Sequence, residues 1–66
     1  MTATINLDVL RNSLAKKEMS LTEMLAKAGH FGSMGTRIMK GYPLRVKTIG
    51  KIANVLEIDP AELISK

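Results

Sequence analysis

The sequence predicts an all-α fold, a compact bundle of about five short helices that form one domain over residues 1–66. Three observations predict it. Apolar residues recur at the three-to-four spacing of amphipathic helices, helix start and stop signals frame each apolar run, and aromatic residues make up only 3% of the chain. The chain contains no Cys, so no disulfide can stabilise so small a domain, and helix packing or dimerisation must do so instead.

The first two helices have clear boundaries in the sequence. A helix is expected from about residue 6 to residue 17, with Asn6 as its N-cap and Leu10 and Leu14 on its buried face. The next helix starts at the capping box Ser20-Leu21-Thr22-Glu23, in which a Ser hydroxyl and a Glu carboxylate satisfy each other's backbone N–H groups. Gly29 is expected to end this helix in the left-handed conformation.

A third helix is expected to begin between residues 31 and 34 and to end at Gly41. Phe31, Met34 and Ile38 have the spacing of a buried stripe. Arg37 and Lys40 fall on the opposite side of this helix. One glycine inside it, Gly35, lowers helix stability by about 1 kcal/mol relative to Ala.

The last two helices follow the break at Tyr42-Pro43. A helix is expected from about residue 47 to residue 56, and its apolar stripe consists of Val46, Ile49, Ile52, Ala53 and Leu56. Asp59-Pro60-Ala61-Glu62 then predicts a short final helix, with an Asp N-cap and Pro in the first helical position.

The charge distribution points to a polyanionic partner. The formal net charge is +4, and no acidic residue occurs between Glu23 and Glu57. That interval holds the basic residues Lys27, Arg37, Lys40, Arg45, Lys47 and Lys51. A region of one charge sign is typical of a surface that binds nucleic acid, although a solvated basic surface has the same composition.

Several functional classes have no support in the sequence. There is no Cys nucleophile, no phosphate-binding glycine loop and no group of metal ligands around the single histidine, His30. We therefore expect no enzyme activity, cofactor, metal or small-molecule substrate. Residues 1–9 lack the features of a signal peptide, and no apolar run is long enough to cross a membrane, so a cytoplasmic protein is expected.

The chain resembles the phage repressor and Cro type of helix-turn-helix domain, also called lambda-repressor-like. The resemblance covers nearly the whole chain and is carried by four segments: Met24-Leu25-Ala26-Lys27-Ala28-Gly29, then Gly41, then Thr48-Ile49-Gly50-Lys51-Ile52-Ala53-Asn54-Val55-Leu56, and Asp59-Pro60-Ala61-Glu62-Leu63. It implies that the second helix crosses the DNA backbone and that the third helix enters the major groove.

Carried over position by position, the resemblance implies two sets of DNA contacts. Base contacts are expected at Gly32, Ser33, Thr36 and Arg37. Backbone contacts are expected at Leu21, Thr22, Lys40, Tyr42, Arg45 and Lys47. Arg37 has the geometry to bind guanine bidentately, and a phosphate contact is the alternative for the same side chain.

The resemblance also implies a partner and a setting. The expected partner is double-stranded DNA, bound at a pseudo-palindromic operator by a homodimer in the cytoplasm of a bacterial or phage-infected cell, in association with the nucleoid. Ile58, Leu63 and Ile64 are candidates for the dimer interface. The same apolar residues would equally serve to close the helix bundle.

Four residues depart from the family pattern and motivate a second hypothesis. Leu21 replaces a common Gln, Gly35 replaces a core residue, Phe31 replaces a capping residue, and Met39 replaces a residue that is often Glu. Each change weakens a DNA-reading surface or makes it more apolar. The alternative is a protein-interaction module on the same fold, such as an antirepressor or an antitoxin-like partner of another regulator.

Overall fold

The computed structural model describes residues 1–29 and 34–64 of the chain. In this part of the chain the elements follow the order β1 (Thr2–Ala3), α1 (Leu7–Lys17), α2 (Leu21–Lys27), α3 (Met34–Met39), β2 (Leu44–Arg45), α4 (Val46–Leu56) and α5 (Pro60–Leu63). Five helices were expected and are present here. The two short strands were not expected, so the all-α prediction needs this addition.

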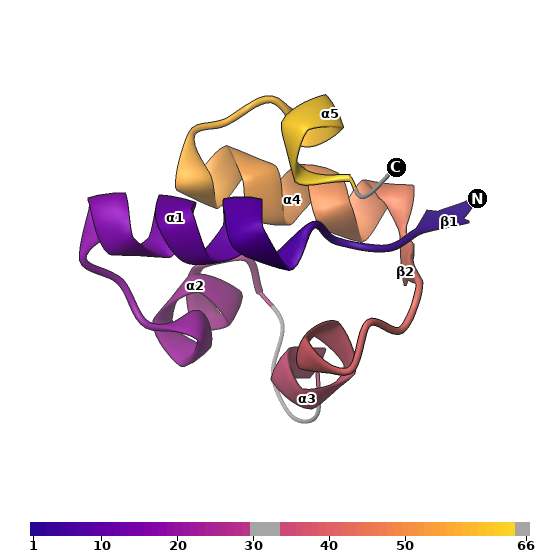
Figure 1. The fold of residues 1–66 in the computed structure, drawn as a ribbon, viewed down its shortest axis with the longest axis horizontal. Helices are drawn as coiled ribbons and strands as arrows, with labels where there is room; N and C mark the ends of the chain where they lie inside the picture. Colours follow the sequence, from indigo (N-terminus) through magenta and orange to yellow (C-terminus); the bar gives the residue numbers. More distant parts are fainter. Residues whose placement is uncertain (30–33, 65–66) are drawn as a thin grey trace.

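The helices lie in two layers around α4. Figure 1 shows α1, α4 and α5 in the upper part of the view and α2 and α3 beneath them. Helix α4 contacts α1, α2, α5 and β2. Its inward stripe is completely buried at Ile49, Ile52 and Ala53, as the spacing predicts. Val46 was expected in this stripe but is 37% exposed, because it is the first residue of α4 and lies beyond the packed part of the helix.

Side chains cap three of the helices at their N-termini, as predicted. The Asn6 side chain accepts hydrogen bonds from the backbone N–H groups of Asp8 and Val9. The Ser20 hydroxyl accepts one from Glu23 at 3.1 Å. The Asp59 carboxylate accepts one from Ala61 at 2.9 Å. Each cap satisfies backbone donors that the helix itself leaves unpaired, which explains where α1, α2 and α5 begin.

The helix ends divide into expected and unexpected types. Gly29 (φ 82°) and Gly41 (φ 78°) adopt the left-handed conformation, in line with their predicted role as stop residues. Glu18 (φ 51°) and Glu57 (φ 58°) adopt the same conformation at the ends of α1 and α4. These two ends are joined by an ion pair between Lys17 and Glu57. The left-handed conformation was not predicted at either Glu18 or Glu57, because Glu gives no sequence signal for it.

The N-terminal segment ties distant parts of the chain together. Strand β1 pairs antiparallel with β2, with Thr2 opposite Arg45 and Ala3 opposite Leu44. Beyond the strands, the Val46 N–H donates to the Met1 carbonyl at 3.2 Å. The Asn6 N–H donates to the Leu63 carbonyl at 2.7 Å. Residues 1–6 therefore hold the start of α4 and the end of α5 in fixed positions.

Candidate nucleic-acid interface

Helices α2 and α3 pack against each other in the order required for a helix-turn-helix. Helix α2 ends at Lys27, with Ala28 as its C-cap, and Gly29 then turns the chain. On α2 the side chains of Met24 (0% exposed) and Leu25 (6% exposed) are in the core, so this helix is anchored on its inner face. The expected base contacts Gly32 and Ser33, together with Phe31 and His30, lie outside the described residues.

Leu21 and Gly35 lie at the contact between the two helices. A Cβ atom on Gly35 would lie 3.4 Å from Leu21 Cδ2 and 3.4 Å from Leu25 Cδ1. These are ordinary van der Waals distances. Leu21 is half-buried, and its side chain covers the space that Gly35 leaves open. Two of the departures from the family pattern are therefore packed against one another, and Leu21 retains only its backbone N–H for a phosphate.

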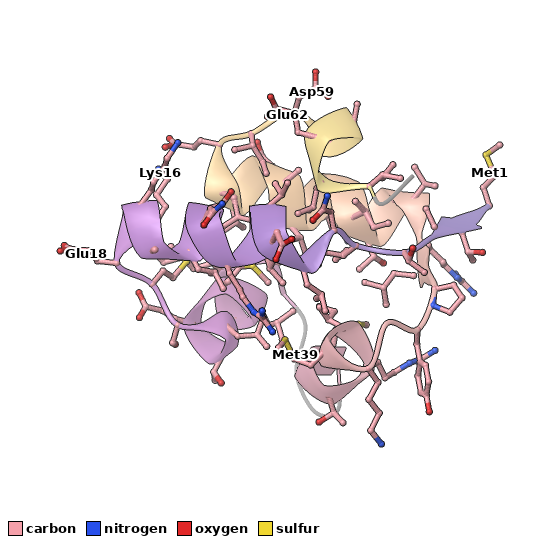
Figure 2. The ribbon with its side chains drawn as sticks, in the orientation of Figure 1. Met1, Lys16, Glu18, Met39, Asp59 and Glu62 are labelled. Atoms are coloured by element: carbon pink, nitrogen blue, oxygen red, sulfur yellow. The ribbon has the colours of Figure 1, made fainter. Side chains whose placement is uncertain are left out.

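Helix α3 has one buried side and one exposed side. Ile38 is 1% exposed and belongs to the core, and Met34 packs partly against it. Thr36, Arg37 and Lys40 are all exposed. Their outward position agrees with the helical spacing from which the two sides were predicted. Met39 is also 44% exposed on this helix, and Figure 2 shows it at the lower part of the view, away from α5.

The remaining expected backbone contacts follow α3 along the chain. Tyr42 is 49% exposed, and Arg45 and Lys47 are exposed as well. Leu44 lies between them and is only 4% exposed, so it anchors this basic segment to the core. Thr22 is exposed in the first turn of α2. The expected backbone contacts Thr22, Tyr42, Arg45 and Lys47 therefore flank α3 on both sides in the sequence, and each lies on the surface of the fold.

A hollow lies where α3, the two strands and the start of α4 meet. It has a volume of about 440 Å³ and is lined by Thr2, Met34, Arg37, Pro43, Leu44, Arg45 and Thr48. None of these residues is acidic. The sequence predicts DNA contacts at Arg37 and Arg45 but gives no sign that Thr2 lies beside either of them. The neighbourhood of Thr2 and Arg45 arises from strand pairing, and a strand of two residues is too short to show an alternating pattern in the sequence.

Half of the six acidic residues lie at the end of α4 and around α5, whereas Glu23 lies in the first turn of α2. Asp59 and Glu62 lie on and beside α5, at the top of the view in Figure 2, whereas α3 lies at the bottom. Glu57 caps the end of α4 and is paired with Lys17. The acid-free part of the sequence includes all of α3, β2 and α4. The side of the molecule that carries α3 is therefore the one suited to an anionic partner.

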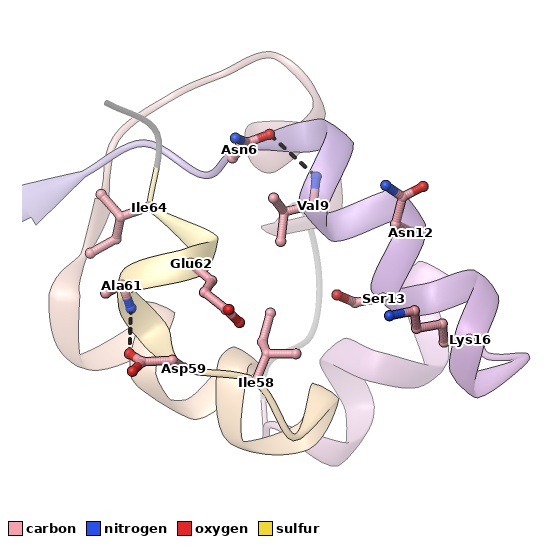
Figure 3. Close-up of a pocket in the computed structure, with 10 residues that line it drawn as sticks. All are labelled: Asn6, Val9, Asn12, Ser13, Lys16, Ile58, Asp59, Ala61, Glu62 and Ile64. Atoms are coloured by element: carbon pink, nitrogen blue, oxygen red, sulfur yellow. Dashed lines mark hydrogen bonds between the residues drawn. The ribbon is translucent and has the colours of Figure 1, made fainter.

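A second depression lies between α1 and α5. It has a volume of about 740 Å³ and is lined by Asn6, Val9, Asn12, Ser13, Lys16, Ile58, Asp59, Ala61, Glu62 and Ile64 (Figure 3). We call it the α1–α5 groove. Two of the three candidate dimer residues, Ile58 and Ile64, line it and are partly buried. The third, Leu63, is 0% exposed and belongs to the core, where it closes the bundle.

Two further features concern other classes of function. Among residues 1–29 and 34–64, no three His, Cys, Asp or Glu side chains come together as ligands for a metal ion. In the same part of the chain, every helix is too short or too polar to cross a membrane.

Comparison with protein families matches residues 9–65 to the Cro/C1-type HTH DNA-binding domain. Comparisons with the curated proteins and with the solved structures give no match. The family match spans nearly the whole chain and includes α2 to α5 and all of α1 except its first two residues. The matched family is a non-enzymatic domain that binds DNA, which agrees with the exposed basic side of α3. The chain belongs to the Cro/C1-type helix-turn-helix family of DNA-binding domains.

Proposed function

We propose that this protein is a sequence-specific transcriptional regulator that places α3 in the major groove of DNA. The observation that supports this most directly is the two-sided character of α3. Ile38 is held in the core, while Thr36 and Arg37 are exposed on the same short helix. The major groove is wide enough for a helix, and its edges distinguish all four base pairs. Thr36 and Arg37, with Gly32 and Ser33 before them, are the proposed base contacts.

The proposed contacts with the DNA backbone lie on both sides of α3. Lys40, Tyr42, Arg45 and Lys47 contact phosphates on one side. Thr22 and the backbone N–H of Leu21, in the first turn of α2, contact them on the other. The exposure of these side chains supports the assignment. Such contacts fix the position of the protein on the duplex, whereas α3 selects the sequence.

The proposed active form is a homodimer on a pseudo-palindromic operator, because two copies of α3 then bind successive major grooves about one helical turn apart. Ile58 and Ile64 support this proposal, since both line the α1–α5 groove and keep part of their apolar surface in solvent. Leu63 is left out of the interface because its side chain is fully buried within one chain.

One observation favours a second function, a protein-interaction module such as an antirepressor or antitoxin-like partner. Met39 is 44% exposed on α3, close to the proposed DNA-reading residues, and an exposed Met suits an apolar partner. Leu21 and Gly35 no longer support this alternative, because the packing between them accounts for both.

Selection of bound duplexes from a random DNA pool, at near-physiological salt, separates these functions. The proposed regulator enriches a motif with two-fold symmetry. Binding that enriches no motif and disappears at higher salt would mean non-specific binding to the DNA backbone. Non-specific binding depends on counterion release and is therefore sensitive to salt. Absence of binding would favour the protein-interaction module.

A further inference from the structure

The hollow between α3, the two strands and α4 has no assigned role. We infer that it holds one phosphate of the DNA backbone, bound by the Arg45 guanidinium and the Thr2 hydroxyl. This inference rests on the proposed function, and it adds the N-terminal strand to the DNA-binding surface. Thr2 belongs to no helix of the helix-turn-helix, and residues 1–8 lie outside the region matched to the family.

The strand register brings these two side chains together. Thr2 and Arg45 are direct partners in the antiparallel pair. Side chains of directly paired residues project from the same face of the strands, with Cβ atoms about 4.5–5.5 Å apart. Leu44, which precedes Arg45 in β2, is buried, whereas Thr2 and Arg45 are both exposed. The Thr2 hydroxyl and the Arg45 side chain therefore share the solvent side of the two strands.

The lining of the hollow suits an anion. Both of its charged residues, Arg37 and Arg45, are basic. Part of the wall is apolar, from Met34, Pro43 and Leu44. Arg can donate two parallel hydrogen bonds to phosphate oxygens, and a Thr hydroxyl can donate a third.

The start of α4 adds to this environment. Its N-cap residue is Arg45, which makes no side-chain capping bond, and the Val46 N–H is taken by the Met1 carbonyl. Thr48, in the first turn of α4, lines the hollow. The positive end of the α4 dipole thus lies beside the proposed phosphate. Because Arg37 of α3 also lines the hollow, a phosphate here would lie beside the groove that α3 enters.

The test is a comparison of Thr2→Val with Thr4→Val in full-length protein. Valine keeps the branched shape that strands favour and removes only the hydroxyl. Thr4 lies just beyond β1 and does not line the hollow, so it controls for the same chemical change nearby. Affinity for the selected duplex and for a scrambled duplex is measured by fluorescence anisotropy over a range of salt, after thermal unfolding has shown that each variant is folded.

We expect Thr2→Val to weaken binding to both duplexes by about threefold to tenfold, the effect of one hydrogen bond, with an unchanged salt slope. Arg45→Ala should weaken binding to both duplexes and reduce the slope by about one unit. Thr4→Val should behave like the wild type. Inorganic phosphate, added at constant ionic strength, should not displace the duplex, since the proposed ligand is a phosphate held in register by DNA.

Two results would overturn the inference while leaving intact the proposed regulator and its base contacts on α3. One is equal affinity of Thr2→Val and Thr4→Val for a duplex that the wild type selects. The other is an Arg45→Ala variant with the wild-type salt slope. If the wild-type protein binds neither duplex, the proposed function and this inference both fail.

Discussion

Leu21 covers the bare backbone of Gly35, with its Cδ2 atom 3.4 Å from the position of a Cβ on that glycine. The missing side chain on α3 and the apolar side chain on α2 therefore form one packing unit. It sets how closely the two helices approach. The orientation of α3, and so of Thr36 and Arg37, depends on this contact.

The Leu21–Gly35 contact predicts opposite effects for small and large substitutions. Gly35→Ala should raise the free energy of unfolding by up to about 1 kcal/mol, because the added methyl group fits at contact distance and helix propensity improves. Gly35→Leu should lower it by about 1–3 kcal/mol through overpacking against Leu21 and Leu25. Urea denaturation measures both effects.

Gly50 provides the matched control, since a Cβ there would meet nothing within 4 Å. Gly50→Leu should therefore be tolerated. Adding Leu21→Ala to the Gly35→Leu variant should relieve part of its penalty, because the two sites are in contact. Equal costs for Gly35→Leu and Gly50→Leu would show that Leu21 does not restrict this position.

Glu18 offers a second test of backbone conformation. Its φ of 51° is unfavourable for a side chain with a Cβ atom, and glycine is the usual residue at such a helix end. Glu18→Gly should raise the free energy of unfolding by about 0.5–1 kcal/mol, as measured by thermal unfolding. Glu57→Gly should gain less, because it also removes the ion pair with Lys17. A loss of stability in Glu18→Gly would contradict the left-handed conformation.

Arg37 is predicted to contribute to sequence selection. Arg37→Ala should lose on the order of 1–3 kcal/mol of binding free energy on the selected site and relax the preference at one base position. Repeating the duplex selection with the variant measures that change. An equal loss on selected and scrambled duplexes would instead assign Arg37 to a phosphate.

Lys47 is predicted to contact only the backbone. Lys47→Ala should weaken binding to all duplexes alike and lower the salt slope by about one unit, because one fewer phosphate is neutralised. Titrations of two unrelated duplexes at several salt concentrations measure both quantities. A slope identical to that of the wild type would remove Lys47 from the interface.

Ile58 is predicted to support the dimer. Ile58→Ala should weaken self-association by about tenfold, which corresponds to about 1.4 kcal/mol of lost apolar contact, as measured by sedimentation equilibrium. Val55→Ala is the control, since Val55 also packs partly against the core but does not line the α1–α5 groove. Unchanged association in Ile58→Ala would place the dimer interface elsewhere.

Much of the fold could be predicted because its signals are local. The caps at Asn6, Ser20 and Asp59 and the left-handed glycines at Gly29 and Gly41 each depend on a few neighbouring residues. The buried stripe of α4 follows from its spacing alone. These features place α3 within the bundle, and with it the exposed positions of Thr36 and Arg37.

The features that sequence analysis missed depend on residues far apart in the chain. The pairing of Thr2 with Arg45 joins the N-terminus to the segment between α3 and α4, and neither strand is long enough to show a pattern. The partnership of Leu21 and Gly35 was also missed, since each looked like a separate defect in a DNA-binding surface. Only the packing of α2 on α3 shows that one compensates for the other.

The most direct test of the account is to map backbone amide chemical shifts by NMR as the selected duplex is added to labelled protein. The account predicts large shifts on α3, the first turn of α2, β2 and the start of α4, together with Thr2. Exposed residues of α1 outside the α1–α5 groove, such as Asp8 and Ala15, should be little affected. Shifts confined to α1 and α5, with α3 unchanged, would contradict the account.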